Sequence, residues 1–399
     1  EQMKGEVKFL RAFAYHFLLN NWGGVPIIEE PLTLEELKRP RNTAEEVLDF
    51  ILKDLDEAAK VLPETWSSEY AGRITKGAAL GMKARVLLYA GRWEEAAIAA
   101  KAVMDLGVHS LFSSYEDLFE ISNKYNEEVL YAWQYVGQNM ANYTQIYMHF
   151  PSFGGWGGTN PLQEFVDGIL CTDGKPSNES AVYNPDKPYE NRDPRFYMSV
   201  IYPGSTYRGV EIPVDGDVDY PGATGNSSQS GYYTRKFLDE GAARYALIPM
   251  ESNVIILRYA EVLLTYAEAK IESGSIDQSV YDAINMLRAR AYGVDISQTD
   301  KYPAVTGGSQ EELRKIVRNE RMIELCFEGQ RRDDIIRWRT AEKLMNGACY
   351  GIPIEKDGKE HILVMERRFD PSYHYLFPIP QDEIDLIGKD IMKQNPGWD

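Results

Sequence analysis

Two pairs of helix-patterned segments repeat along this sequence, and they constrain the fold more than any other feature. Alanine and leucine recur in them at three- and four-residue spacing, which is typical of helices that pack closely against neighbours. The first pair comprises Lys76–Ala90 and Trp93–Leu106, and the second comprises Val254–Ser273 and Ile276–Tyr292. We therefore expect the chain to be built largely from paired helices.

The two pairs also match at an offset of 183 positions. In each pair a small residue lies in the first helix, a glycine ends that helix, and another small residue lies in the second. The matching residues are Ala84 and Ala267, Gly91 and Gly274, and Ala100 and Ala283. This pattern is typical of tetratricopeptide-like repeats. Because each pair keeps an open apolar face, we expect the pairs to be stable only when they stack.

Weaker helix pairs flank these two. They comprise Gly5–Asn20 with Thr43–Leu62, and Ser309–Phe327 with Arg331–Met345. Residues 138–253 have no helical period and are rich in Gly, Pro, Asn, Ser, Asp and Tyr, a composition that favours turns and loops. Short strands are expected beside this region, at Glu128–Gln134 and Phe196–Ile201.

The sequence thus predicts a mainly α protein in which a tetratricopeptide-like helical repeat scaffold carries a large loop-rich insertion subdomain. Four parts are expected: an N-terminal helical repeat part (1–137), a loop-rich ligand-binding subdomain (138–253), a C-terminal helical repeat part (254–346) and a loop-rich tail that packs back on the scaffold (347–399). We also expect the natural protein to extend further at its N-terminus, because the first helix pattern begins without a cap or lead-in.

The charge balance argues against one class of partner. The chain has 43 Lys+Arg and 61 Asp+Glu, which gives a formal net charge of −18. Phosphate recognition needs a basic surface, so we expect no binding of nucleic acid and no electrostatic docking on an anionic membrane. Cysteines at 171, 326 and 349 are widely spaced and odd in number, which predicts neither a disulfide framework nor a thiolate zinc site.

A catalytic function finds little support in the sequence. It contains no HExxH, GxSxG, P-loop or complete GxGxxG motif. Glu320, Glu324 and Glu328 lie four residues apart, and glycoside hydrolysis does require two carboxyl groups about 5–10 Å apart. However, neighbouring arginines would lower the pKa of these carboxyls, which is the wrong direction for a general acid. We therefore expect a structural ion-paired helix, no catalytic residues and no enzymatic activity.

A calcium site is a weaker hypothesis. Asp215, Asp217 and Asp219 alternate in a DGDVD motif, as carboxylates do in calcium-binding loops. The motif lacks the glycine and the terminal glutamate of an EF-hand, since Tyr220 and Asn226 occupy those positions. We expect no cofactor and no metal, and keep these three aspartates as weak calcium candidates.

The aromatic residues of the irregular segments are the best candidates for ligand contacts. The chain has 26 tyrosines and 7 tryptophans, and several lie among Gly, Ser and Asn, including Tyr143 and Tyr147 beside the glycine-rich loop 154–158. An exposed aromatic face suits the apolar face of a sugar ring. The residues predicted to bind ligand are Trp66, Tyr70, Trp156, Tyr207 and Tyr232.

Segments along the whole chain resemble the SusD/RagB family of outer-membrane nutrient-binding lipoproteins from Bacteroidetes. They occur in the family's order. The segments are Gly5–Ile27, Ala44–Pro63, Gly72–Ala96, Asn191–Phe196, Ile255–Gly274, Ile284–Ala291, Ile316–Trp338, Leu376–Ile384 and Gln394–Trp398. Any one of them is weak, but their number and order make the resemblance specific.

The resemblance implies a right-handed superhelical scaffold, no catalysis, and a lipid-anchored position at the cell surface. It also implies a partner, a TonB-dependent outer-membrane transporter of the SusC kind, to which the protein delivers an oligosaccharide or polysaccharide. The family's lipidated cysteine is not among the three internal cysteines, so the anchor is expected outside this chain. The matching segments belong to the scaffold, so the family's ligand-contacting aromatics cannot be carried over residue by residue.

Alternative functions remain open at this point. The same scaffold could bind a peptide or another nutrient, and a glycoside hydrolase or a helical-repeat adaptor for protein motifs are more distant alternatives. A neutral glycan is expected to bind with little dependence on salt. Steep salt dependence would indicate an acidic glycan instead, bound through an arginine such as Arg73 or Arg208.

Overall fold

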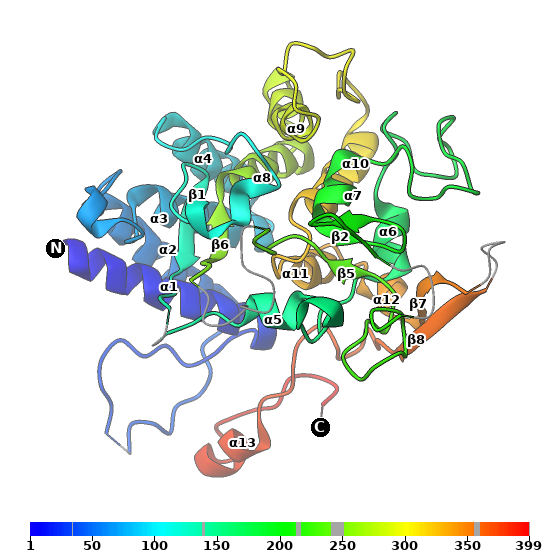
Figure 1. Cartoon of the computed structure of the whole chain (residues 1–399). Helices are drawn as coiled ribbons and strands as arrows, with labels where there is room; N and C mark the ends of the chain where they lie inside the picture. The colour runs from blue at the N-terminus through cyan, green and yellow to red at the C-terminus, as the bar shows by residue number, and fades with distance from the viewer. Residues whose placement is uncertain (34, 138–139, 213–216, 241–250, 355–359, 399) are drawn as a thin grey trace. The chain divides into compact units, whose positions relative to one another are not determined.

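The computed structural model describes the chain except residues 34, 138–139, 213–216, 241–250, 355–359 and 399 (Figure 1). Contacts divide the chain into two compact units. Unit 1 consists of Glu1–Val108, Gln330–Asn346 and Arg368–Asp399, and unit 2 consists of His109–Gly329 and Gly347–Arg367. The four-part division expected from composition stays a prediction.

Unit 1 is built on four consecutive helices. They are α1 (Gln2–Trp22), α2 (Ala44–Val61), α3 (Lys76–Tyr89) and α4 (Trp93–Asp105). Each packs against the next along the chain, α1 on α2, α2 on α3 and α3 on α4. The later segments of this unit add three short helices, α11 (Arg331–Arg337), α12 (Ala341–Leu344) and α13 (Gln381–Ile387).

Local sequence signals explain where these helices begin and end. A capping box starts α2: the Thr43 hydroxyl accepts a hydrogen bond from the Glu46 backbone N–H, and the Glu46 carboxylate accepts one from the Thr43 N–H. Small buried residues of α3, among them Ala78 and Ala84, allow its neighbours to approach closely. Gly91 follows at φ 74°, in the left-handed region that favours glycine. The predicted α3–α4 pair is therefore confirmed.

Unit 2 contains the second predicted pair, α8 (Tyr259–Glu272) with α9 (Gln278–Ala291), and α8 also packs on α10 (Gln310–Glu324). One detail of the prediction is wrong. The first residues of the expected helix form strand β6 (Val254–Arg258) instead, which pairs antiparallel with β1 (Val129–Trp133). Three consecutive β-branched residues at 254–256 favour this extended conformation.

The loop-rich part of unit 2 contains short elements. The helices are α5 (Thr144–Met148), α6 (Gln163–Gly168) and α7 (Pro194–Ser199). Antiparallel two-stranded pairs join β2 (Val200–Ile201) to β5 (Tyr233–Thr234), β3 (Thr206–Tyr207) to β4 (Val210–Glu211), and β7 (Gly347–Pro353) to β8 (His361–Arg367). The strand expected at 196–201 is therefore mostly helix: Asp193 caps α7, and a proline begins it.

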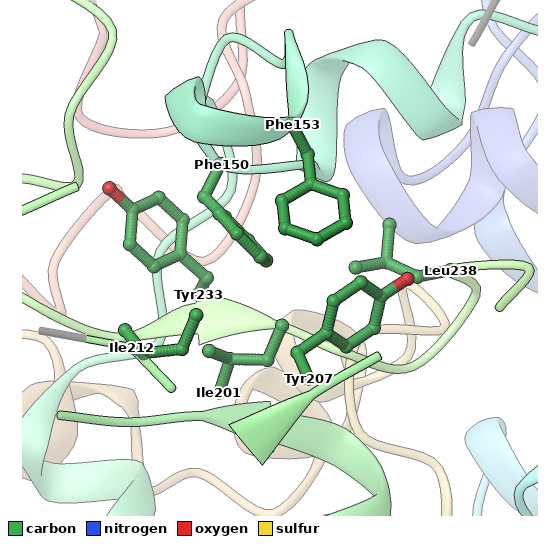
Figure 2. Close-up of a cluster of buried hydrophobic side chains, with 7 residues drawn as sticks. All are labelled: Phe150, Phe153, Ile201, Tyr207, Ile212, Tyr233 and Leu238. Atoms are coloured by element: carbon green, nitrogen blue, oxygen red, sulfur yellow. The ribbon is translucent and has the colours of Figure 1, made fainter. Parts of the chain in front are cut away.

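This loop-rich part has an apolar core of its own. Figure 2 shows the buried side chains that form it: Phe150, Phe153, Ile201, Tyr207, Ile212, Tyr233 and Leu238. Aromatic rings dominate, and the Phe150 and Phe153 rings meet edge to face with centroids 4.7 Å apart. The loops are thus held by side-chain packing as well as by hydrogen bonds.

Most of the regular structure in the described residues is helical, and the paired helices form the tetratricopeptide-like scaffold that the repeats predict. Among these residues, none of the helices combines the length and the hydropathy that crossing a bilayer requires.

Candidate functional site

The five residues predicted to bind ligand are distributed over both units. Trp66 and Tyr70 belong to unit 1, and Trp156, Tyr207 and Tyr232 belong to unit 2. Whether they contact ligand stays a prediction. The structure does, however, separate those with accessible rings from those without.

Trp66 and Tyr70 form an aromatic pair in the connection between α2 and α3. Their ring centroids lie 6.1 Å apart in an edge-to-face arrangement. The Trp66 indole N–H donates to the carbonyl of Ile74 at 2.9 Å, which fixes the ring. The guanidinium carbon of Arg73 lies 4.1 Å from the Trp66 ring centroid, and Glu6 accepts a hydrogen bond from the Arg73 Nε at 2.9 Å. Tyr70 is therefore the more accessible ring, at 45% exposure.

Trp156 forms a second, more open pair with Tyr147 of α5. Their rings lie 5.0 Å apart and nearly perpendicular, and they are 44% and 51% exposed. Backbone hydrogen bonds fix the loop against the helix, since the N–H of Trp156 donates to the carbonyl of Ile146 at 2.7 Å and that of Gly158 donates to the carbonyl of Tyr147 at 2.6 Å. Tyr143, also half exposed, precedes α5.

Two glycines make this arrangement possible. A Cβ atom at Gly155 would lie 2.1 Å from the carbonyl oxygen of His149, and one at Gly157 would lie 2.3 Å from that of Asn226. Gly157 also has φ 50°. Because only glycine tolerates such close approaches of the backbone, the loop can lie flat against α5 and leave the Trp156 ring exposed. The expected exposure of Trp156 is confirmed.

Tyr207 and Tyr232 are fully buried, so the expectation that they are exposed is wrong. Tyr207 packs in the aromatic core of Figure 2. Tyr232 packs in a neighbouring cluster, and its hydroxyl donates to the Gln163 side-chain oxygen at 2.6 Å. Aromatic and aliphatic side chains surround these rings, among them Phe150 and Phe153 for Tyr207 and Tyr189 for Tyr232. Composition alone could not distinguish a loop that presents an aromatic ring from one that covers it.

Tyr147 is the candidate that the prediction left out of its site. A usable signal was present, since Tyr143 and Tyr147 are four residues apart and directly precede the glycine-rich loop. The pairing of Tyr147 with Trp156 depends on how the loop folds back on α5, which no spacing in the sequence encodes.

The glutamates of α10 lie in a buried ion-pair network within unit 2. Glu324 contacts three guanidinium groups: Arg195 Nη1 at 3.0 Å, Arg258 Nη1 at 2.7 Å and Arg290 Nη2 at 2.5 Å. The other pairs are Arg195–Glu320, Arg288–Glu320, Arg258–Glu128, Arg258–Glu328 and Lys236–Glu328. Glu320 and Glu324 have no exposed side-chain surface.

The charges of this network suit structure and oppose acid catalysis. Burial alone would raise the pKa of Glu324, but Arg290, Arg258 and Arg195 outweigh burial and hold that pKa well below its usual range. Burial would also raise the pKa of Glu328, but the charges of Arg258 and Lys236 outweigh burial and lower that pKa. Both carboxyls are therefore ionised near neutral pH and have no proton to donate. The prediction of an ion-paired helix is confirmed.

The calcium hypothesis concerns three aspartates, of which Asp215 lies outside the described residues. The carboxylate of Asp219 is buried and accepts hydrogen bonds from the backbone N–H and the hydroxyl of Ser152, at 2.8 and 2.5 Å. Asp217 is exposed. In the part of the chain that the structure describes, no cluster of three or more His, Cys, Asp or Glu is arranged to hold a metal. Calcium binding stays a prediction.

Comparison with known families identifies the fold and its class. Residues 121–398 match the model of the SusD family, and residues 1–88 match a model described as "starch-binding associating with outer membrane". The chain therefore belongs to the SusD family, as the order of its segments indicated.

Individual relatives agree with this assignment. A SusD-like carbohydrate binding protein from Bacteroides fragilis has a similar solved structure, with 29% identity, a TM-score of 0.88, and coverage of 96% of this chain and 79% of the other. A second SusD-like protein from the same species is 32% identical, with a TM-score of 0.85 over 99% of this chain and 79% of the other. The SusD-like protein P25 of Formosa agariphila is 25% identical over 96% of this chain and 70% of its own length.

Proposed function

We propose that the protein binds a glycan at the outer-membrane surface without altering it chemically. The observation that carries this proposal is the Tyr147–Trp156 pair, in which two half-exposed rings are held by backbone hydrogen bonds. A pyranose can stack its apolar face on one ring while its hydroxyl groups bond to nearby polar groups. Asn160 and Gln229 lie beside this loop, joined by a hydrogen bond from the Gln229 N–H to the Asn160 side-chain oxygen.

Family membership supports a sugar as the ligand. A relative with 29% identity is described as a carbohydrate binding protein. Trp66 and Tyr70 supply a further aromatic pair, and we keep both as ligand-binding residues. Tyr207 and Tyr232 are buried and offer no ring for stacking, and the role proposed for Tyr232 is only to support the loops that carry the exposed rings.

We propose that the protein is not a catalyst because the closely spaced Glu324 and Glu328 are ionised and buried. A general acid must hold a proton near neutral pH and must reach its substrate. Glu324 and Glu328 meet neither condition, because both are ionised and their side chains, 0% and 4% exposed, lie among cations.

The cellular setting is proposed from the family. The description of the model that matches residues 1–88 supports an outer-membrane location. We propose a lipid anchor outside this chain and delivery of the glycan to a SusC-like TonB-dependent transporter. Detergent extraction of the full-length protein from its native membrane should co-purify a β-barrel transporter. Recovery without one would contradict the transporter partnership and leave glycan binding intact.

A glycan array, screened in parallel with a peptide pool, tests the binding function. We expect glycan binding, and loss of about ten-fold in affinity on Trp156→Ala or Tyr147→Ala, since stacking contributes about 1–2 kcal/mol. Tyr350→Ala is the matched control, because Tyr350 is 42% exposed on the β7–β8 hairpin of the same unit. Binding of peptides alone, or equal losses in all three variants, would refute the proposed site.

A further inference from the structure

Four buried polar atoms without hydrogen-bond partners are grouped in the loop-rich part of unit 2. They are both ring nitrogens of His149, the hydroxyl of Tyr207 and Nη1 of Arg208; the described residues contain further unpaired buried atoms, such as Nε of Arg192 and Nε of Arg290. His149 is 1% exposed and Tyr207 is fully buried. Native proteins pair nearly all such atoms, because a buried polar group left unpaired is costly. A group of them therefore marks a place where a polar ligand can bind.

One phenylalanine ring brings the three residues together. The His149 ring stacks on Phe153 with centroids 5.0 Å apart, and the Tyr207 ring meets Phe153 edge to face at 5.5 Å. The guanidinium carbon of Arg208 lies 5.9 Å from the same ring centroid. The Tyr207 hydroxyl points toward the apolar side chain of Leu238, as Figure 2 shows.

Arg208 is held in this place by an unusual backbone conformation. It is the first of the two residues that join β3 to β4, and both it and Gly209 have positive φ, at 50° and 76°. This turn geometry favours Asn-Gly, since a longer side chain is disfavoured in the left-handed region. In the described residues Arg208 forms no hydrogen bond or ion pair. Arg73, the other arginine considered for an acidic ligand, is instead paired with Glu6.

The nearby carboxylates are engaged elsewhere. Glu240 accepts two hydrogen bonds from Arg235, at 2.9 and 2.6 Å, and Asp239 accepts one from the Ile121 N–H at 3.2 Å. Asp219 is bonded to Ser152. Among the described residues, the guanidinium of Arg208 therefore has no carboxylate partner.

The three side chains together favour an anion. Arg208 and Tyr207 present hydrogen-bond donors, and neutral His149 presents one donor and one acceptor. Burial, and then the charge of Arg208, lower the pKa of His149 to about 3, so Arg208 supplies the positive charge. Charge-assisted hydrogen bonds from a guanidinium to a carboxylate or sulfate are the strong ones. On a chain with net charge −18, an acidic ligand needs such a local cation.

We propose that Arg208, with His149 and Tyr207, binds the carboxylate or sulfate group of an acidic glycan. The inference rests on the proposed glycan binding and gives that ligand a charge. The site also adjoins the exposed aromatic pair: His149 comes two residues after Tyr147, and its carbonyl accepts a hydrogen bond from the Gly157 N–H at 2.9 Å. One glycan can therefore stack on Trp156 while its acidic group lies at Arg208, the partly exposed member of the group.

The test uses uronate-containing and sulfated oligosaccharides, each presented beside its carboxyl-reduced or desulfated form. We expect the wild-type protein to prefer the acidic member of at least one pair by ten-fold or more. Arg208→Asn should abolish that preference and retain binding of the neutral member. Because Asn-Gly suits this turn, the variant should melt at the same temperature as the wild type or higher. Lys187→Gln removes one exposed positive charge from the same unit and should leave the preference unchanged.

The outcomes separate this inference from the proposed function. If the wild-type protein binds neutral members as well as acidic ones, or if Arg208→Asn keeps the preference, the inference is wrong and glycan binding stands. If no glycan of either kind binds, both are wrong. A lower melting temperature in Arg208→Asn with an unchanged preference would indicate that Arg208 has a structural role only.

Discussion

Two regions of unit 2 bury polar side chains, and they do so in opposite ways. Around α10, carboxylates and guanidinium groups meet at 2.5–3.0 Å, and Glu324 alone contacts three arginines. Around Phe153, by contrast, His149, Tyr207 and Arg208 bury polar atoms that find no partner among the described residues. Glu324, His149 and Tyr207 are fully or almost fully buried, whereas Arg208 is partly exposed. What separates them is whether the protein itself supplies the partners.

This difference indicates different roles. The carboxylates of the α10 network already have cationic partners, so removal of one of them leaves buried guanidinium groups unpaired and acts on stability. An unpaired group next to exposed aromatic rings costs stability in the free protein, and a ligand can recover that cost. Changes in the first region should therefore lower the free energy of unfolding and leave ligand affinity unchanged. Changes in the second region should lower ligand affinity and leave the free energy of unfolding unchanged or higher.

The largest effect is expected for Glu324→Gln. The variant leaves buried guanidinium groups without their shared negative charge, which should lower the free energy of unfolding by roughly 3–5 kcal/mol. Urea denaturation measures this change. Glu311→Gln is the control, because Glu311 and its partner Lys315 lie on the exposed side of the same helix, and it should have no measurable effect. An intact melting temperature with lost binding would contradict the structural role of Glu324.

The next effect concerns acid stability. His149 has a pKa of about 3 when folded, below the unfolded value of about 6.5, so the unfolded chain binds more protons between these values. Stability should therefore fall as pH drops from 6.5, by at most about 1.4 kcal/mol per pH unit for this one residue. His149→Phe should flatten the dependence between pH 6.5 and 5 in urea unfolding. Equal slopes would show that His149 is paired or protonated in the folded protein.

The aromatic pairs should give a smaller effect, confined to affinity. Trp66→Ala and Trp156→Ala should each weaken binding of the cognate glycan about ten-fold, as expected for loss of one stacking contact. Isothermal titration calorimetry gives the affinity, and the melting temperature gives the control. If a variant that combines Trp66→Ala with Trp156→Ala binds the glycan as the wild type does, the sugar platform lies elsewhere.

The smallest effect is expected from calcium removal. Asp219 already accepts two hydrogen bonds from Ser152, so its carboxylate does not require a metal to satisfy it. Chelation with EDTA should leave the melting temperature unchanged. A rise on adding calcium, absent when Asp217 and Asp219 are replaced by asparagine, would establish a calcium site at this loop.

The sequence predicted the scaffold well because its signals are local. Capping residues such as Thr43 and Ser309, and the glycine at 91, act within a few residues of the helix ends that they define. The ion-paired nature of α10 was also predictable, since arginines crowd its glutamates. Its actual partners, Arg195, Arg258 and Arg290, come from distant segments, and spacing alone does not identify them.

The candidate site was predicted only in part, because exposure in a loop depends on tertiary packing. Trp156 and Tyr233 both lie among Gly, Ser and Asn, yet only Trp156 is exposed. Tyr233 can be buried because its hydroxyl donates to the carbonyl of Asp219 and accepts from the Ser228 N–H, each at 2.8 Å. Such partners are fixed only once the loops have folded on their shared core.

One paired measurement tests most directly whether the α10 network and the exposed Tyr147–Trp156 pair have separate roles. Melting temperature and glycan affinity are determined for Glu324→Gln and for the Tyr147→Ala/Trp156→Ala double variant, with affinity measured well below either melting transition. We predict that Glu324→Gln melts much earlier and binds as the wild type does, whereas the double variant melts as the wild type does and loses at least ten-fold in affinity. If both variants lose stability and affinity together, the two regions are not separate in function and the account is contradicted.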